Sequence, residues 1–267
     1  MFEHDELQMA TVELVFKGQT FSISSLVRTI GGELLVCLHG LGCSKEYFAG
    51  ISSCRDLNRF SLLIPDLPGF GASAAPEGFS YNLAEVAEIC RVLITNCDAT
   101  NIHILGHSMG GAIGVLLAET LGAKVGGFAN VEGTLIDQKR RIDTRNDSLD
   151  YDQYRRIHLP AVIAVTALSE EKGRREWSKS LERSNPMALF RSMRSLDIWA
   201  SSGRLIQSFN RMNCRKRYIV GEKNGRHPVI PYLQGIAVKI IPGSGHFPMI
   251  DNPSAFYAAV ADVFAGR

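Results

Sequence analysis

Residues 102–111, Ile-His-Ile-Leu-Gly-His-Ser-Met-Gly-Gly, constrain the fold of this chain more than any other segment. An apolar, strand-like run leads directly into Gly-x-Ser-x-Gly at 106–110, and helix-forming residues follow at once. A sharp strand-to-helix turn crowds the backbone, and Gly106 and Gly110 relieve the crowding because they have no Cβ. Such a turn holds the weakly nucleophilic hydroxyl of Ser108 rigidly and aims helix N–H groups at a developing negative charge. The segment predicts a nucleophile elbow; a glycine-rich turn without a catalytic role is the competing interpretation.

Length and composition indicate an ordinary globular protein. The 267 residues suffice for one large domain with an insertion, or for two small domains. Hydrophobic residues make up 45% of the chain and charged residues 21%, which argues against disorder. The formal net charge of +2 is too close to zero to indicate a nucleic-acid or membrane-surface partner.

The N-terminus and the cysteines favour a cytoplasmic location. The first six residues, Met-Phe-Glu-His-Asp-Glu, lack the basic start and apolar core of a signal peptide. No run of about 18 apolar residues predicts a transmembrane helix. The six cysteines have no metal-ligand spacing, and several lie in apolar runs, so we expect reduced, mostly buried thiols. We therefore expect no metal, no cofactor, no nucleic acid and no membrane partner, and a monomer or homodimer.

Strand-like and helix-like segments alternate along the chain. A hairpin is expected at 11–28, with its turn around Lys17, Gly18 and Gln19. Short apolar runs typical of buried parallel strands occur at 34–38, 60–64, 102–105, 125–131, 217–220 and 237–241. Helical spacing occurs at 83–96 and 109–121 and after Pro253 to about 264. The alternation predicts a mostly parallel sheet with helices on both faces.

Residues 134–210 interrupt this alternation. The stretch lacks β-branched runs and has helical patches at 151–156, 161–168, 174–181 and 188–199. Trp177, Phe190 and Trp199 supply apolar anchors, so we interpret it as a helical cap over the strand ends, with a partly disordered linker as the alternative. Its 14 Lys and Arg against 10 Asp and Glu weakly favour a substrate with an anionic part.

Four motifs in order carry a resemblance to a known family. They are His-Gly-Leu-Gly at 39–42, Asp-Leu-Pro-Gly-Phe-Gly-Ala-Ser at 66–73, Gly-His-Ser-Met-Gly-Gly at 106–111 and Gly-Ser-Gly-His-Phe-Pro at 243–248. With them the chain resembles the α/β-hydrolase superfamily over nearly its whole length. The resemblance implies the α/β-hydrolase fold, with a mostly parallel central sheet, a core domain of residues 1–133 and 211–267, and a helical cap domain of residues 134–210.

The resemblance also implies most of a catalytic site. In this family the triad runs Ser, acid, His along the chain, so Ser108 is the implied nucleophile and His246 the implied base. The backbone N–H groups of Leu41 and Met109 are the implied oxyanion hole. Asp66 is expected to fix a turn rather than to take part in chemistry.

The acid departs from the commonest pattern of the family. Many relatives carry Asp after the strand that follows the cap, but this chain has Asn224 there. An amide cannot supply the charge that stabilises an imidazolium. Some relatives, including a group of haloalkane dehalogenases and zearalenone-lactone hydrolases, place the acid after the strand that follows the nucleophile helix, where this chain has Glu132. We predict Glu132 as the acid, with Glu222 or an acid not yet identified as alternatives.

Several residues are candidates for contact with substrate. Gly40 and Phe247 flank the implied catalytic residues and are the predicted substrate-binding positions, and Met109 is a further candidate. A second set in the cap is expected to form the cap's own core or, less favourably, an acyl pocket: Met187, Leu189, Phe190, Met193 and Trp199.

These residues predict a serine hydrolase that cleaves a small-molecule carboxylic ester or lactone through an acyl-enzyme. Haloalkane dehalogenases and epoxide hydrolases of this fold use Asp as the nucleophile, so Ser108 argues against both. Amide, thioester or carbon–carbon bond hydrolysis on the same triad is the first alternative. Asn224 motivates another, a weakly catalytic ligand receptor.

Overall fold

The computed structural model describes residues 4–74, 76–137 and 149–265. Within these ranges eight strands form one sheet, in the order β1-β2-β4-β3-β5-β6-β7-β8. The β1–β2 hairpin and the β2–β4 pair are antiparallel, and all the other pairs are parallel. The predicted fold class, a mostly parallel sheet with helices, is confirmed.

The expected core elements form, and apart from β1, which begins at His4 instead of residue 11, their bounds are close to those read from the apolar patterns. The strands are β1 (His4–Phe16), β2 (Gln19–Thr29), β3 (Glu33–Leu38), β4 (Ser61–Pro65), β5 (Asn101–His107), β6 (Val125–Val131), β7 (Arg215–Gly221) and β8 (Val238–Ile241). The core helices are α1 (Leu83–Thr95), α2 (Met109–Leu121), α8 (Pro248–Asp251) and α9 (Pro253–Phe264). The short α8 has no counterpart among the predicted helices.

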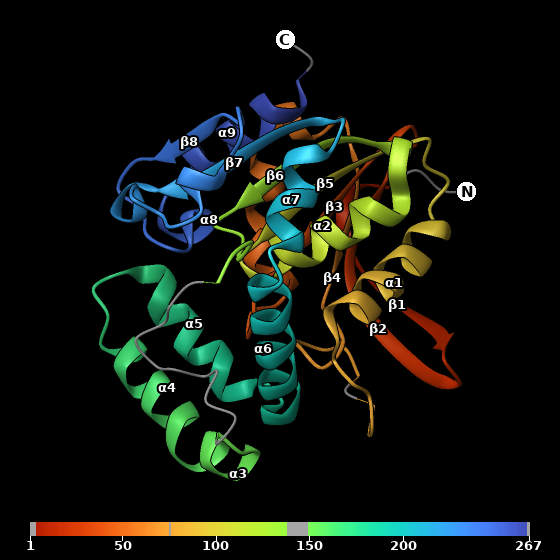
Figure 1. Ribbon diagram of the computed structural model, residues 1–267. Coiled ribbons are helices and arrows are strands. Elements are labelled where there is room, and N and C mark those ends of the chain that lie inside the picture. The colour runs from red at the N-terminus through yellow and green to blue at the C-terminus, as the bar shows by residue number, and fades with distance from the viewer. Residues whose placement is uncertain (1–3, 75, 138–148, 266–267) are drawn as a thin grey trace.

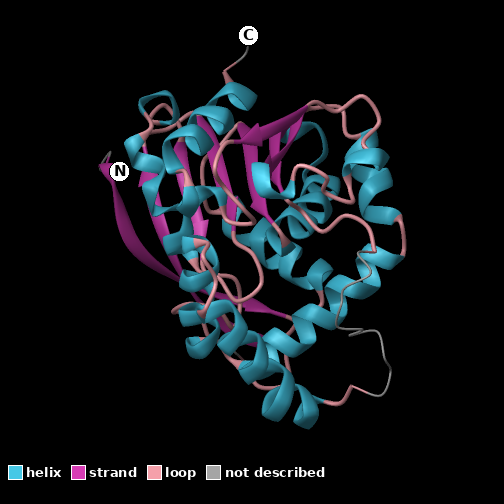
Figure 2. Cartoon of the chain, turned by 90° about the vertical axis from the view of Figure 1, so that its left-hand side faces the viewer, coloured by secondary structure: helices cyan, strands magenta, loops and turns pink. Residues whose placement is uncertain are grey.

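Helices cover both faces of the sheet, as Figures 1 and 2 show. Side chains alternate across a strand, and β3 illustrates the result. Leu34 and Val36 join a hydrophobic cluster with α1 and α2, whereas Leu35 and Cys37 join a second cluster with α8 and α9. Burial on both faces explains why this strand has an unbroken apolar sequence.

Between β6 and β7 the chain forms a helical insertion. Its helices are α3 (Tyr151–Gln153), a π-helical turn (Tyr154–His158), α4 (Leu159–Ala167), α5 (Lys172–Arg183), α6 (Pro186–Ser201) and α7 (Arg204–Arg211). Figure 1 shows α3, α4 and α5 grouped beside the core. The helix α7, not expected from the sequence, packs on the core, with the Phe209 ring centroid 5.4 Å from that of Phe128.

Several side-chain hydrogen bonds fasten this insertion to the core, among them one from α5 and one from α6. The indole Nε1 of Trp177, on α5, donates to the carbonyl of Leu41 at 2.8 Å. The hydroxyl of Ser195, on α6, accepts from the backbone N–H of Leu83, the first residue of α1, at 3.0 Å. The helix α5 is therefore held directly against the loop that follows β3.

Among the described helices, none has both the length and the apolar character needed to cross a bilayer. The division into core and cap domains, the cytoplasmic location and the oligomeric state stay predictions.

Candidate active site

Ser108 lies at the sharp turn between β5 and α2. Its backbone has φ +53° and ψ −114°, a conformation that non-glycine residues rarely adopt and that costs free energy. The surrounding chain holds it there, because the Ser108 N–H donates to the carbonyl of Val131 at 2.9 Å and its own carbonyl accepts from Gly111 at 3.0 Å. The hydroxyl is thus carried on a strained turn between two regular elements.

The glycines of this turn are required by its packing. A Cβ on Gly110 would lie 2.1 Å from the carbonyl oxygen of Leu38, and one on Gly106 would lie 2.6 Å from the carbonyl oxygen of Gly110. Backbone atoms at these distances leave no room for a side chain. The crowding predicted from Gly-x-Ser-x-Gly is what the structure contains.

The loop between β8 and α8 brings His246 to the carboxylate of Glu132. The imidazole Nδ1 lies 2.6 Å from Glu132 Oε2, although 114 residues separate the two positions. The His246 side chain is 29% exposed and the Glu132 side chain is fully buried. An Nδ1–H bond to a carboxylate leaves Nε2 as the nitrogen available to accept a proton.

Glu132 immediately follows β6 and accepts several hydrogen bonds. The backbone N–H of Gly221 donates to Oε1 at 2.8 Å, and the Asn224 amide nitrogen lies 3.1 Å from Oε1 and 2.9 Å from Oε2. Burial by itself raises the pKa of Glu132, but the bonds from His246 and Gly221 outweigh it, and the pKa lies below its ordinary value of 4.5. The carboxylate is therefore charged at neutral pH.

Glu222, the named alternative to Glu132, and Asn224, at the commonest acid position of the family, have other contacts. Glu222 is exposed, and its Oε2 accepts from the N–H of Gly243 at 2.8 Å. Asn224 donates to both carboxylate oxygens of Glu132. The amide at the commonest acid position therefore supports a carboxylate supplied by another strand.

His107 contacts the candidate base, a role that the sequence motifs do not assign to it. Its Nε2 donates to the carbonyl of His246 at 2.8 Å, and the two rings pack with centroids 4.9 Å apart. Burial first, and the charge of His246 second, lower the pKa of His107 to about 3, so it stays neutral. A neutral buried ring that holds the His246 backbone has a positioning role, which only spatial contact reveals.

The loop after β3 is ordered by His39 and Asp66. His39 Nδ1 donates to the Gly40 carbonyl at 2.8 Å and its Nε2 accepts from the N–H of Leu67 at 2.9 Å, so both ring nitrogens serve the backbone. The buried Asp66 carboxylate pairs with Lys45 Nζ at 2.7 Å and accepts from the N–H of Ala72 at 2.8 Å. Asp66 thus fixes the turn.

A cavity of about 510 Å³ contains the hydroxyl-bearing turn and the imidazole. The described residues that line it are Gly40, Leu41, Cys43, His107, Ser108, Thr134, Arg174, Trp177, Leu196, His246 and Phe247. Gly40, Leu41 and Phe247 therefore line the same cavity as Ser108, and their roles stay predictions. Met109 begins α2 beside Ser108, but its side chain is buried in the core.

The insertion contributes other side chains to this cavity than the set considered from the sequence. Arg174, Trp177 and Leu196 line it, whereas Met187, Leu189, Phe190, Met193 and Trp199 do not. Leu189 and Met193 are buried in the hydrophobic core instead. Helical periodicity identified the apolar faces, but which face meets the cavity depends on how the helices dock.

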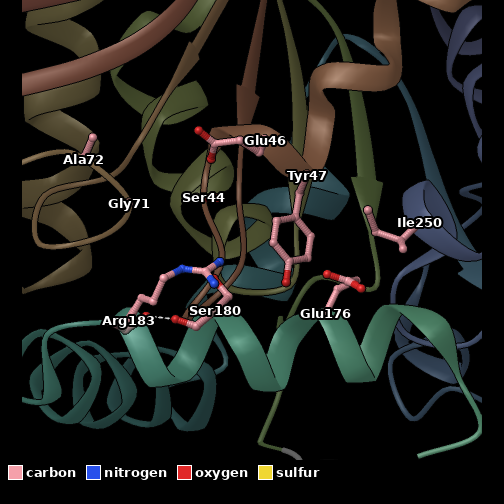
Figure 3. A pocket seen from close by; sticks show the side chains of 10 residues that line it. Ser44, Glu46, Tyr47, Gly71, Ala72, Glu176, Ser180, Arg183 and Ile250 are labelled. Carbon is pink, nitrogen blue, oxygen red and sulfur yellow. Dashed lines mark hydrogen bonds between the residues drawn. The ribbon is translucent and has the colours of Figure 1, made fainter. Parts of the chain in front are cut away.

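A separate cavity of about 460 Å³ lies on another side of α5 and includes Ser44, Tyr47, Glu176, Ser180 and Arg183 in its lining. Figure 3 shows the Tyr47 ring pointing toward α5, from which Glu176, Ser180 and Arg183 reach back. Neither Ser108 nor His246 lines it. We therefore place the candidate active site in the cavity that contains both.

The part of the chain that the structure describes contains no candidate metal-binding site. Within those residues, no three His, Cys, Asp or Glu side chains form a group suited to a metal ion.

Comparison with known proteins agrees with this geometry. The profile of the alpha/beta hydrolase family matches residues 35–260. The chain belongs to the alpha/beta hydrolase family. Lipase 1 of Psychrobacter immobilis is 28% identical over 251 residues, which cover 83% of this chain and 74% of the lipase. The family match supports a hydrolase.

Solved structures share the fold over nearly the whole chain. A carboxylesterase from Nitrososphaera gargenis superimposes with a TM-score of 0.77 at 15% identity, covering 95% of this chain and 98% of the esterase. An N-acyl homoserine lactonase, AidH, superimposes with a TM-score of 0.71 at 15% identity, covering 96% of both chains. At this identity the likeness is one of fold.

Proposed function

We propose that this protein is a serine hydrolase of carboxylic esters or lactones. Ser108 is the nucleophile, His246 removes its proton, and Glu132 orients the imidazole and stabilises its charged form. The N–H groups of Leu41 and Met109 hold the oxyanion of the tetrahedral intermediate. The intermediate collapses to an acyl-enzyme as the C–O bond of the substrate breaks and the alcohol oxygen takes the proton held by His246. Water activated by the same histidine then releases the acid from the acyl-enzyme.

The observation that carries the proposal is the 2.6 Å contact between His246 Nδ1 and Glu132 Oε2, beside a serine held on a strained turn. A charged, buried carboxylate at this place supplies what a working imidazole base needs. The contact favours the hydrolase over a weakly catalytic ligand receptor, since Asn224 donates to the proposed acid instead of replacing it.

Names of relatives support an acyl bond as the target. Lipase 1, the carboxylesterase and the lactonase are named for cleavage of esters or of the cyclic ester in a lactone. Attack on the carbonyl of an ester or of a lactone gives the same kind of tetrahedral oxyanion, so one site can cleave either bond. Lactone hydrolysis is therefore tested beside ester hydrolysis.

The test is hydrolysis of 4-nitrophenyl esters from acetate to decanoate, and of an N-hexanoyl homoserine lactone, by the wild type and by Ser108→Ala. We expect turnover that falls by about 10⁴-fold or more in Ser108→Ala. The variant's circular dichroism and melting temperature serve as the folding control. Equal turnover by both proteins would contradict the assignment of Ser108, and absence of turnover on every acyl substrate would contradict ester and lactone chemistry.

A further inference from the structure

A positively charged hollow shares His246 with the candidate active site. It measures about 370 Å³ and is lined by Glu132, Arg174, Lys223, Asn224, Arg226, His227, Pro228 and His246. Arg174 and His246 line this hollow and the Ser108 cavity alike. Arg174 therefore lies beside His246, within reach of a substrate that occupies the Ser108 cavity.

The charges around this hollow do not balance. Arg174, Lys223 and Arg226 line it, against the single carboxylate of Glu132, which His246, Gly221 and Asn224 already bond. The nearby Glu171 contacts Arg174 at 2.9 Å and Lys223 at 4.0 Å. Because Glu132 is bonded to His246, the three cations that line the hollow exceed the single negative charge of Glu171.

The guanidinium of Arg174 is held by one hydrogen bond, and only part of its donors take part in it. Its Nε donates to Glu171 Oε2, while its two terminal nitrogens bond none of the residues that the structure describes. Glu171 in turn packs over Gly245, next to His246, since a Cβ on Gly245 would lie 2.2 Å from Glu171 Oε2. Glu171 thus holds the Nε side of the arginine, and the terminal fork, which matches a carboxylate in shape, stays available.

Stability of α5 does not account for an arginine at this place. Arg174 is the third residue of the helix, in its first turn, where the helix dipole disfavours cations. Its side chain is 40% exposed, so it is not required to fill the core. A bound anion would satisfy both the free fork and the unfavourable helix position.

We propose that Arg174 binds a carboxylate of the substrate, supported by the positive field of Lys223 and Arg226. Resting on the hydrolase proposed above, this makes the preferred substrates esters or lactones that carry a second, free carboxylate in their acyl or alcohol part. Neutral esters of the same size are poorer substrates, because they leave the arginine fork without a partner.

The test compares matched ester pairs in wild type and Arg174→Gln. One pair is mono(4-nitrophenyl) glutarate and 4-nitrophenyl pentanoate; the other is 4-acetoxybenzoate and its methyl ester. We expect the ratio of kcat/KM, anionic over neutral, to fall by about 10- to 100-fold in Arg174→Gln for at least one pair. The neutral ester should lose less kcat/KM than the anionic ester, because it has no carboxylate for the arginine to bind. Lys179→Gln, which removes an exposed cation of α5 outside both cavities, should leave the ratios unchanged.

Unchanged ratios for both pairs in Arg174→Gln would overturn the inference while leaving the hydrolase intact. If the wild type shows no serine-dependent turnover of any ester, the proposed function has failed instead. The inference is then tested by measuring the binding of a carboxylate ligand. Monomethyl glutarate is titrated into Ser108→Ala and into Ser108→Ala with Arg174→Gln by calorimetry. At least about tenfold weaker binding to the double variant supports the carboxylate site, and equal Kd values overturn it.

Discussion

The side-chain amide of Asn224 donates to both carboxylate oxygens of Glu132, at 3.1 and 2.9 Å. Glu132 follows β6 and Asn224 lies just after β7, so neighbouring parallel strands deliver the acid and the group that supports it. The amide offers hydrogens to a carboxylate that is buried and also bonded to His246. Its place in the structure is that of a positioning residue for the proposed acid.

Asn224→Asp is expected to lower kcat/KM by about tenfold or more, and to do so more than Asn224→Ala. The substitution places a second carboxylate about 3 Å from Glu132, where two like charges cannot both ionise, so the pair would share a proton. Ester kinetics across pH 5 to 9 measure the effect. Wild-type kinetics in Asn224→Asp would refute a positioning role.

An exchange of the two groups serves as the matched control. Glu132→Gln combined with Asn224→Asp restores one amide and one carboxylate within the same hydrogen-bonded pair. We expect this double variant to be more active than Glu132→Gln alone, because a negative charge again lies near His246. Activity no higher than that of Glu132→Gln would show that the two positions are not coupled.

The buried charge of Glu132 predicts a pH-dependent stability. Its pKa is lowered in the folded protein, so its contribution is fully present above the ordinary value of 4.5 and is lost as the pH falls through the folded value. At pH 7, Glu132→Gln should lower the free energy of unfolding by about 1–3 kcal/mol, because the donors around residue 132 lose an anionic acceptor. Denaturant unfolding should show this difference shrink below about pH 4.5. A difference that stays constant down to pH 3 would contradict it.

His107 predicts a second acid effect with its own pH window. Its pKa is about 3 when folded and 6.5 in an unperturbed chain, so between these values the unfolded state binds a proton that the folded state does not. Stability is lost as the pH falls from 6.5, by about 1.4 kcal/mol per pH unit. Glutamine cannot titrate, so His107→Gln should reduce the slope of the free energy of unfolding against pH by the amount that corresponds to about one proton. His158→Gln, at a partly exposed position, should leave the slope unchanged.

The tight elbow predicts a large difference between two Gly→Ala substitutions. Gly110→Ala should cost about 3 kcal/mol or more, because the new Cβ would lie 2.1 Å from the Leu38 carbonyl oxygen. Gly31→Ala places its Cβ in open space at φ +84°, so only the left-handed backbone is penalised, by about 1–2 kcal/mol. Chemical denaturation of both variants makes the comparison. Equal losses would mean that the close approach at Gly110 relaxes freely.

Local patterns predicted most of the fold. Residues 109–121 and 125–131 form α2 and β6 with the expected bounds, since each is a largely apolar run with glycine-containing turns beside it. The short α8 and the polar α7 escaped prediction because few apolar positions define them. The contact of Glu132 with His246 agrees with an expectation drawn from the family resemblance, in which some relatives place the acid after the strand that follows the nucleophile helix.

By itself, the sequence determined the individual strands and helices, the strained serine turn and the order of the candidate residues, because these depend on local patterns along the chain. Tertiary structure alone decided that Asn224 supports Glu132, that His107 holds the His246 backbone, and that Arg174 and Trp177 face the cavity. Those contacts join residues far apart in sequence, and helical periodicity does not determine how an amphipathic helix docks. Packing between elements sets them, and no local pattern encodes it.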